Sequence, residues 1–418
     1  MAAIGFIYGW SVFSAPLAQE FGWEPTVLSF TFTVLMWAFC AGGIVGAKVA
    51  ARTSARTTLA IAAAGMFVAF VLSALFMRQD TPWLLYAAYG GLGGCSVGMA
   101  YTATMGASVA WFPDKAGLAS GALLLCYGAS TLVLGSVATG LFAALGWRRA
   151  FVVLAAALAL VVVVASLALH RPTDAEASAL PRPEASAGRG EAAQAGADRD
   201  TKGMLATPAF WSYAGWMFLA SCIGLGFIGS ANQIALESGA DVAVAVGLVG
   251  LLSVCNGAGR LVGGLLFDVL GTGRAMAVVA ASHFLGCALA VGALVAASVP
   301  LMAVAVLVGG IGIGGVSALG SGFMATAFGP KHYAENLSVL NLVLIPAALV
   351  GPSVMGTSAT VAGSYVFGTA ALAALGAGAL GLSALTALLL SRRRQGYRAR
   401  RKPETCPTVA LDPQVDTF

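Results

Sequence analysis

The sequence predicts an all-α membrane protein with twelve transmembrane helices, arranged as two halves of six. Three observations carry this prediction. The 418 residues are 59% hydrophobic and 9% charged, whereas soluble domains carry about 25% charged residues. Uncharged apolar stretches recur along the whole chain, and each is near the roughly 20 residues that cross a bilayer as a helix. One long polar stretch, residues 170–206, divides them into two equal sets.

The apolar stretches give twelve predicted spans, six on each side of the polar stretch. They are residues 2–19, 27–48, 58–77, 83–110, 118–144, 149–169, 208–235, 243–266, 275–297, 300–327, 336–361 and 365–390. Four segments follow from this map: an N-terminal half, a linker, a C-terminal half and a basic tail, at residues 1–169, 170–206, 207–391 and 392–418. The linker is rich in Ala, Pro, Gly and charged residues and has no apolar periodicity, which is typical of a flexible segment.

Lysine and arginine are distributed unevenly between the two sides of the predicted membrane. With the N-terminus inside, eighteen of the 22 fall in cytoplasmic segments, and only Arg78, Arg148 and Arg149 fall in outer loops. The positive-inside rule therefore predicts a multi-pass protein of the cell's inner membrane with both termini cytoplasmic. The basic tail is expected to touch anionic lipid. The first apolar stretch begins almost at Met1, so no cleavable leader is expected and a natural start upstream stays open.

Composition and spacing also exclude several classes of function. The seven cysteines form no CxxC or other metal-type spacing, so neither a structural zinc site nor a disulfide framework is expected. The basic residues lie in loops and the tail, which argues against nucleic-acid binding. No acidic residue and one histidine, His283, fall inside a span, so the chain lacks a nucleophile–base pair at depth. We therefore expect no enzyme activity, no metal and no cofactor.

Arg260 is the one basic residue predicted to lie inside the membrane. It sits in the eighth span, within LLSVCNGAGRLVGGLLFDVLGTGR at residues 251–274. A central arginine costs roughly 3 kcal/mol on insertion scales. Arg260 precedes Asp268 by eight residues, which is about 12 Å of helix and close to the middle of a roughly 30 Å core. The donors of a guanidinium match both oxygens of a carboxylate, so the sequence favours an anion site; snorkelling or binding to helix carbonyls is the alternative.

Several other polar side chains are predicted near the depth of Arg260. These candidates for a substrate cavity are Tyr8, Tyr101, Tyr127, Asn256 and Asn341. Each tyrosine could equally form a helix–helix hydrogen bond or lie at the interface, and interhelical bonding is the stronger reading for the two asparagines. His283 could titrate near neutral pH as a proton site, but a hydrogen-bonded structural histidine is the favoured interpretation.

Three motifs suggest a known family. They are WFPDKAGLASG at 111–121, TPAFW at 207–211 and NGAGR at 256–260, which precedes a Gly-x-x-Phe-Asp turn at 264–268. An internal echo, WFPDK after the fourth span and FGPK after the tenth, points to duplication of a six-span unit. Over its whole length the chain resembles the major facilitator superfamily, and within it the oxalate–formate antiporter and monocarboxylate transporter branch.

The resemblance implies roles for particular residues. In that branch the eighth-span arginine contacts the substrate carboxylate and aromatic residues of spans one, four and five line the cavity, and Arg260, Tyr8, Tyr101 and Tyr127 stand at the matching positions. The gating motifs would comprise Asp268, Gly264, Gly271 and Arg274, together with Asp114 and Lys115.

The chain also departs from the branch. Leu344 stands where oxalate carriers have a lysine, and Ile313 and Ser317 replace large aromatics. Ala51 replaces the Asp of the first gating loop. A single fixed positive charge in a roomier pocket favours a monocarboxylate over a dicarboxylate.

These patterns together predict a monomeric secondary active transporter of small organic anions, most simply monocarboxylates, which works by alternating access through exchange or symport. The first alternative is a proton-coupled symporter of lactate-like acids. Asn256 stands where such carriers pair an Asp with the arginine, which argues against proton coupling. The second alternative is efflux of hydrophobic compounds.

Overall fold

The computed structural model describes residues 1–418 except 24, 171, 174, 177–179, 181–197 and 401–418. Side chains at 7–9, 11, 12, 14, 15, 25, 26, 29, 131–133 and 392–400 also lie outside the description. The described chain is all-α, as the composition predicts.

The N-terminal half consists of six helical passages. The first is a 3₁₀ helix, η1, followed by α1, and the fourth contains a short helix, a π-helix and a longer α-helix in series. The elements are η1 (Ala2–Gly9), α1 (Trp10–Phe21), α2 (Pro25–Arg52), α3 (Ala55–Phe76), α4 (Pro82–Leu84), η2 (Leu85–Gly93), α5 (Gly94–Ala110), α6 (Ala116–Leu145) and α7 (Trp147–Ala168).

The C-terminal half repeats this number of passages after a short helix at the end of the linker. Its elements are α10 (Thr201–Leu205), α11 (Pro208–Glu237), α12 (Val242–Leu270), α13 (Thr272–Val295), α14 (Val299–Phe328), α15 (Tyr333–Asn341), α16 (Leu344–Ala362) and α17 (Val366–Arg400). The eleventh passage comprises α15 and α16. The twelfth continues into the predicted tail, because α17 remains helical through Arg400.

Among the residues that the structure describes, ten helices are long and apolar enough to cross a membrane. The other two predicted spans, the first and the fourth, are divided into shorter helical elements. In the fourth, the π-helix contains Gly90, Gly91 and Gly93, and π turns inside α-helices are frequent at functional sites.

The eleventh passage breaks at Leu342 and Val343 because of a proline. Pro346 has no N–H to donate to the carbonyl of Leu342, four residues earlier, and its ring crowds that carbonyl. The Leu342 carbonyl instead accepts from the amide of Ile345 at 3.1 Å, and the amide of Val343 donates to Leu340. The predicted span at 336–361 therefore contains a break that separates α15 from α16, although Tyr333–Ala362 as a whole is long and apolar enough to cross a membrane.

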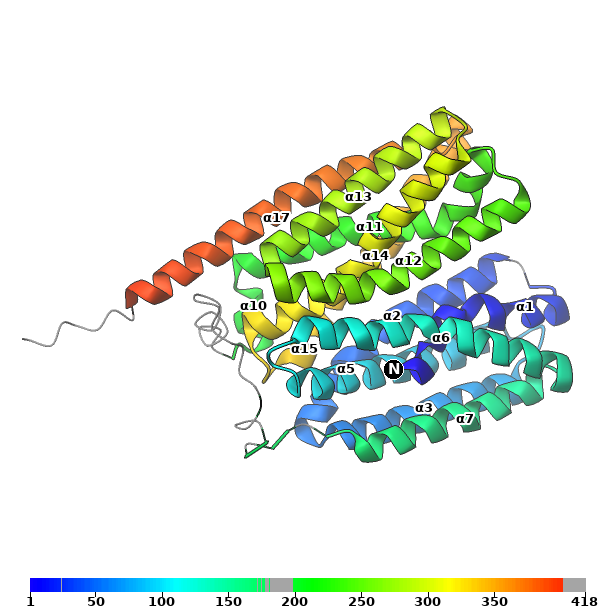
Figure 1. Ribbon diagram of the computed structural model, residues 1–418. Helices are drawn as coiled ribbons and strands as arrows, with labels where there is room; N and C mark the ends of the chain where they lie inside the picture. Colours follow the sequence, from blue (N-terminus) through cyan, green and yellow to red (C-terminus); the bar gives the residue numbers. More distant parts are fainter. Residues whose placement is uncertain (24, 171, 174, 177–179, 181–197, 401–418) are drawn as a thin grey trace, which may run out of the picture.

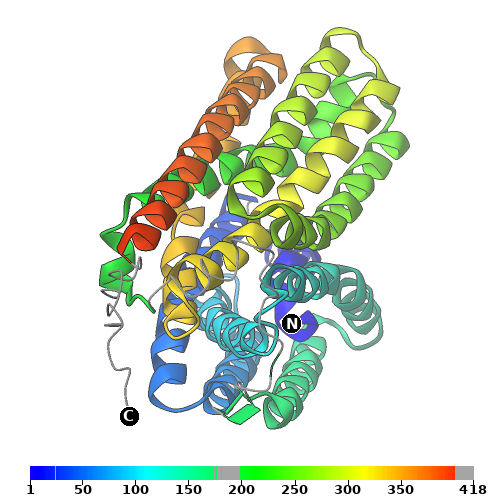
Figure 2. The same ribbon diagram turned by 60° about the vertical axis from the view of Figure 1, so that its left-hand side comes forward.

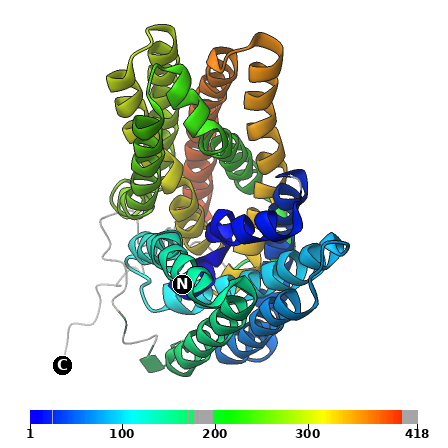
Figure 3. The same cartoon turned by 90° about the vertical axis from the view of Figure 1, so that its right-hand side faces the viewer.

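The two halves form two separate groups of helices, coloured blue to teal and green to red in Figure 1. Figure 3, viewed from the end opposite the linker, shows the same separation. We call the end of the bundle where α12 and α14 end and where α6 and α15 begin the linker end. There α15 lies beside α2 and α5 of the other half, as Figure 2 also shows.

Each half joins its first passage to its sixth at the opposite end through a glutamate. In the N-terminal half, Glu20 of α1 accepts from the indole of Trp147 and pairs with Arg148 at 3.2 Å, both at the start of α7. In the C-terminal half, Glu237 of α11 accepts from the Tyr365 amide at 2.9 Å, and from the hydroxyl of Ser364, just before α17. We call these two contacts the glutamate clasps. They repeat the same connection and support the duplicated architecture.

The last residues of the predicted linker, 198–205, bond to the C-terminal half, whereas most of the segment lies outside the described residues. The Arg199 amide donates to the Phe328 carbonyl at 3.0 Å, and the side chain of Asn336 donates to the Arg199 carbonyl at 3.0 Å. Asp200 caps α10 by accepting from Gly203 at 2.9 Å. Residues 198–205 therefore belong to the linker end of the C-terminal half.

Candidate functional site

Arg260 lies at the contact between the two halves. Its side chain is 7% exposed, and its Nη1 donates to the main-chain carbonyl of Leu124 in α6 at 2.6 Å. The guanidinium thus extends from the C-terminal half to a helix of the N-terminal half and does not reach toward the linker end. The alternative interpretation named snorkelling or helix carbonyls, and a contact with a helix carbonyl is present in this conformation, whereas the anion site stays a prediction.

A glycine on α6 gives the guanidinium access to that carbonyl. In an α-helix the carbonyl of Leu124 points toward residue 128, which is Gly128 in this sequence. A Cβ placed on Gly128 would lie 2.7 Å from Nη1 and 2.9 Å from Cζ of Arg260. The missing side chain is therefore the space that Arg260 occupies. The sequence reasoning did not single out Gly128.

Tyr127 and Tyr101 lie close to each other beside this contact. Tyr127 shares a face of α6 with Leu124, and its ring centroid is 5.6 Å from that of Tyr101 on α5. Tyr101 also contacts Phe39 of α2 at 5.3 Å. Both tyrosines are buried. Helices α12, α6, α5 and α2 therefore bring Arg260 and an aromatic row into one region, and Phe39 is a member that the sequence analysis missed.

The remaining predicted cavity residues have different positions. Asn256 is half-buried one turn before Arg260, with its carbonyl against Gly314 of α14. Asn341 is buried at the end of α15, and its carbonyl accepts from the Cys40 thiol of α2 at 3.5 Å. Its main chain therefore links the two halves. The backbone of Tyr8 belongs to η1, but its side chain lies outside the described residues.

A second contact joins the two halves at the linker end. The carboxylate of Asp268, near the end of α12, accepts from the amides of Gly117 at 3.0 Å and Leu118 at 2.7 Å. These are the second and third residues of α6, whose N-cap residue Lys115 supplies no side-chain cap. A carboxylate satisfies orphan amides there and is stabilised by the positive end of the helix dipole. We call this contact the Asp268 latch.

Glycines allow the two helices to approach closely enough for the latch. A Cβ on Gly264 would lie 2.2 Å from the Gly117 carbonyl, and one on Gly121 would lie 2.5 Å from the Arg260 carbonyl. Because residues 117, 121 and 128 are four and seven apart, they share one face of α6. This spacing is the signal that could have identified the α6–α12 contact from the sequence.

The other predicted gating residues lie around the latch. Gly271 ends α12 with φ +77°, a conformation that favours glycine. Arg274 is exposed on the first turn of α13. Asp114 and Lys115 form the turn before α6, with Asp114 half-buried and Lys115 exposed. The printed contacts of the latch are to main-chain amides of α6, which the resemblance did not specify.

Comparison with known proteins agrees with this arrangement. A family model described as Major Facilitator Superfamily matches residues 1–289. The chain belongs to the Major Facilitator Superfamily. An uncharacterized MFS-type transporter, YhjX of Escherichia coli strain K12, is 27% identical over 279 residues, which are 66% of this chain and 65% of that protein. The chain therefore matches slightly less than two thirds of that relative's length.

Solved structures share the fold of this facilitator. The proton:xylose symporter XylE matches with a TM-score of 0.67 and 15% identity, covering 94% of both chains. The E. coli fucose:proton symporter FucP matches with a TM-score of 0.64 and 12% identity, covering 92% of this chain and 97% of that one. At these identities the likeness establishes the facilitator fold and leaves the substrate class open.

A third contact between the halves of the facilitator is a row of hydroxyl groups, which the sequence analysis missed. Ser321 of α14 hydrogen-bonds Ser120 of α6 and lies 2.6 Å from the phenol oxygen of Tyr333 on α15. All three side chains are buried. Ser120 lies two residues after Leu118 of the latch, near the linker end. The Ser120–Ser321 bond is a polar link that must break when α6 and α14 separate.

His283 lies apart from this region of the facilitator. It is 1% exposed on α13, its Nδ1 is 2.8 Å from the Val279 carbonyl, and its ring packs beside Gly312 of α14. This environment favours the structural interpretation over the proton site. Among the described residues, no group of three or more His, Cys, Asp or Glu side chains is placed to hold a metal ion.

Proposed function

We propose that this facilitator transports small organic anions, monocarboxylates in the first place, by alternating access around Arg260. The observation that carries the proposal is the burial of the Arg260 guanidinium at the contact between the halves, donating to the Leu124 carbonyl of the opposite half. A carboxylate is a stronger acceptor for a guanidinium than a neutral amide carbonyl. A substrate anion would therefore compete with Leu124 for Arg260.

The competition would couple binding to movement of the halves. In the described conformation, Arg260 and the Asp268 latch join α12 to α6, and the Ser120–Ser321 contact joins α14 to α6. Transfer of Nη1 from Leu124 to a substrate would remove the first of these contacts. Rocking of the halves about a central site is the motion by which such repeats alternate their access. This coupling fits exchange, or transport in which the halves move only with substrate bound. Without substrate, Arg260 stays bonded to the Leu124 carbonyl of the other half.

The proposal includes an orientation in the membrane. The excess of Lys and Arg in the linker, the tail and the loops of the same side supports a cytoplasmic linker end. On this orientation the described conformation is closed toward the cytoplasm, and the termini are cytoplasmic. We propose a single chain in the inner membrane as the working unit, since both halves of the site come from one chain.

The substrate class can be tested by thermal unfolding of the purified protein with small ligands. We expect formate, acetate or lactate to raise the melting temperature, because a ligand at about 100 times its Kd stabilises by about 2.7 kcal/mol. Oxalate should stabilise less, since Leu344 supplies no second positive charge. Xylose and fucose should give no shift. Stabilisation by a sugar but by no carboxylate would contradict the proposal.

Replacement of Gly128 by Ala tests whether the Arg260 contact serves transport. The new methyl group would lie 2.7 Å from Nη1, so the guanidinium must move from the Leu124 carbonyl. We expect carboxylate uptake in proteoliposomes to fall at least roughly tenfold, since hydrogen bonds to charged groups contribute about 1.5–3 kcal/mol. The free energy of unfolding should change little, since the preference of a helix for Ala over Gly, about 1 kcal/mol, offsets part of the lost bond.

The matched control is Gly140→Ala in the same helix, where an added Cβ meets nothing within 4 Å. It makes the same chemical change in α6 and should leave uptake unchanged. Equal effects of the two substitutions would show that helix stiffness, not the Arg260 contact, determines the rate.

A further inference from the structure

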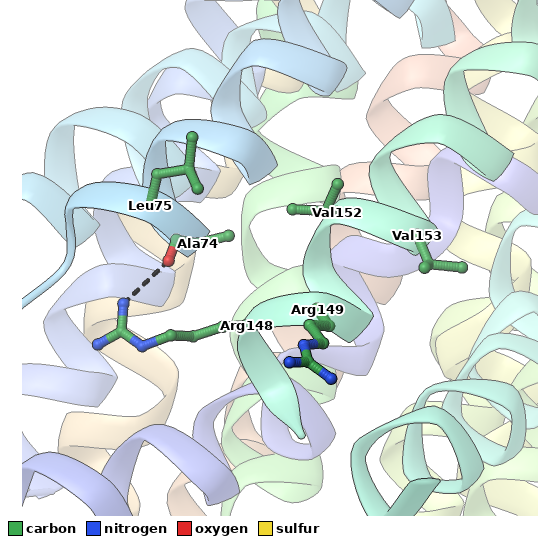
Figure 4. Close-up of a pocket in the computed structure, with 6 residues that line it drawn as sticks. All are labelled: Ala74, Leu75, Arg148, Arg149, Val152 and Val153. Atoms are coloured by element: carbon green, nitrogen blue, oxygen red, sulfur yellow. Dashed lines mark hydrogen bonds between the residues drawn. The ribbon is translucent and has the colours of Figure 1, made fainter. Parts of the chain in front are cut away.

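A groove lies at the end of the bundle opposite the linker, between α3 and α7. It has a volume of about 430 Å³ and is lined by Ala74, Leu75, Arg148, Arg149, Val152 and Val153. Figure 4 shows the two arginines on one side of the groove, with Leu75, Val152 and Val153 beyond them. The groove therefore combines cationic groups with an alkyl wall and is distant in the chain from Arg260.

The two arginines have different roles in the groove. Arg148 is fixed, since its guanidinium donates to the carbonyls of Ala74 at 2.9 Å and Met77 at 3.0 Å, and pairs with Glu20 at 3.2 Å. Its charge is therefore balanced by Glu20 of the first clasp. Arg149, the next residue, is exposed and gives the groove its net positive charge.

The wall of the groove suits hydrocarbon. Leu75, Val152 and Val153 are exposed on the surfaces of two membrane-spanning helices. Exposed apolar side chains of such helices face the acyl chains of the bilayer. A soluble anion would use the arginines but would gain nothing from this wall.

The position of the two arginines in the predicted topology also favours a lipid over a soluble anion. In the sequence-based topology, only three of the 22 basic residues belong to the end opposite the linker, and Arg148 and Arg149 are two of them. Arginine at that end opposes the usual charge bias of membrane proteins. Arg148 is accounted for by its structural bonds, whereas an exposed arginine such as Arg149 at this end suits an anionic partner.

From these observations we propose that the groove binds an anionic phospholipid, with its phosphodiester at Arg149 and the open edge of Arg148 and one acyl chain along Leu75, Val152 and Val153. A guanidinium matches phosphate oxygens with paired donors. Arg148 uses three of its five N–H groups in the bonds given above, so two remain for the lipid. The occupied groove would join the outer ends of α3 and α7.

The test uses the full-length protein in nanodiscs with photoactivatable phosphatidylglycerol, followed by peptide mapping of the labelled residues. Phosphatidylglycerol should label the segments that line the groove, at residues 74–75 and 148–153. Arg149→Gln should lower that labelling about fivefold, as expected for one arginine near an anionic lipid surface, and Arg149→Lys should retain most of it. The matched control is Arg78→Gln, which removes a charge at the same end but outside the groove lining.

Two further arms identify the partner. Photoactivatable phosphatidylcholine, which carries a phosphodiester without net charge, should label the groove less than phosphatidylglycerol, and millimolar inorganic phosphate should not displace the lipid. Val153→Trp, which fills the wall and keeps both arginines, should also reduce labelling. Equal labelling by the two lipids, an unchanged pattern in Arg149→Gln, or full displacement by inorganic phosphate would each overturn the proposal.

Discussion

Arg260→Gln should abolish carboxylate uptake in proteoliposomes while the protein still folds and inserts. Glutamine can donate to the Leu124 carbonyl, but it carries no charge for a substrate anion. Removal of one member of a buried, hydrogen-bonded charge pair costs about 2–5 kcal/mol, so uptake should fall by at least roughly 30-fold. The measurement is the initial rate of labelled monocarboxylate uptake, normalised to reconstituted protein.

The matched control is Arg56→Gln. Arg56 also bonds main-chain carbonyls, those of Ser166 at 3.2 Å and Leu167 at 2.8 Å, but both lie in its own half at the end of α7. This substitution should lower thermal stability slightly and leave the KM for the carboxylate unchanged. Arg260→Lys should retain part of the binding, because the charge remains but the paired donors are lost. Normal uptake by Arg260→Gln would refute the anion-carrier proposal.

Asp268→Asn should open the linker end. The carboxylate accepts from two amides at the positive end of α6, and a neutral amide loses both the charge and one of the two equivalent acceptors. Hydrogen bonds to charged groups contribute about 1.5–3 kcal/mol, so the ratio of closed to open forms should fall by roughly 10- to 150-fold. Hydrogen–deuterium exchange of the Gly117 and Leu118 amides measures this directly and should become faster.

Asp241→Asn provides the corresponding control. Asp241 caps α12 within its own half by accepting from the Val244 amide at 2.8 Å, so the same chemical change breaks no contact between the halves. Exchange should increase near residue 244 and stay unchanged at 117 and 118. If Asp268→Asn left the α6 amides protected, the latch would not be the contact that holds this end closed.

The fold class and the membership of the superfamily could be predicted from the sequence, and the reason is physical. A helix that crosses a bilayer needs a long apolar segment. The composition and length of such segments therefore reveal the membrane passages without any knowledge of how the helices pack. Arg260 and Asp268 were identifiable for the same reason: a charge within or beside an apolar helix needs an explanation. Tyr101 and Tyr127 were also found, and the structure places them in contact.

The remaining details depend on contacts between distant parts of the chain. Gly128 matters because the Arg260 side chain packs against it, and Ser120 matters because Ser321 of the other half hydrogen-bonds it. Neither partner is visible in the local pattern around the residue. The break before Pro346 does not depend on distant contacts. A proline inside an apolar run is a local signal, so this break could have been predicted within the span at 336–361.

The two glutamate clasps have a consequence for how such a molecule can move. Glu20 and Glu237 each connect the first passage of a half to the sixth. The six helices of each half are therefore linked into a closed ring. A closed ring of helices resists sliding of its helices against one another. Deformation is then directed to the contact between the two halves, where Arg260 and Asp268 reach across.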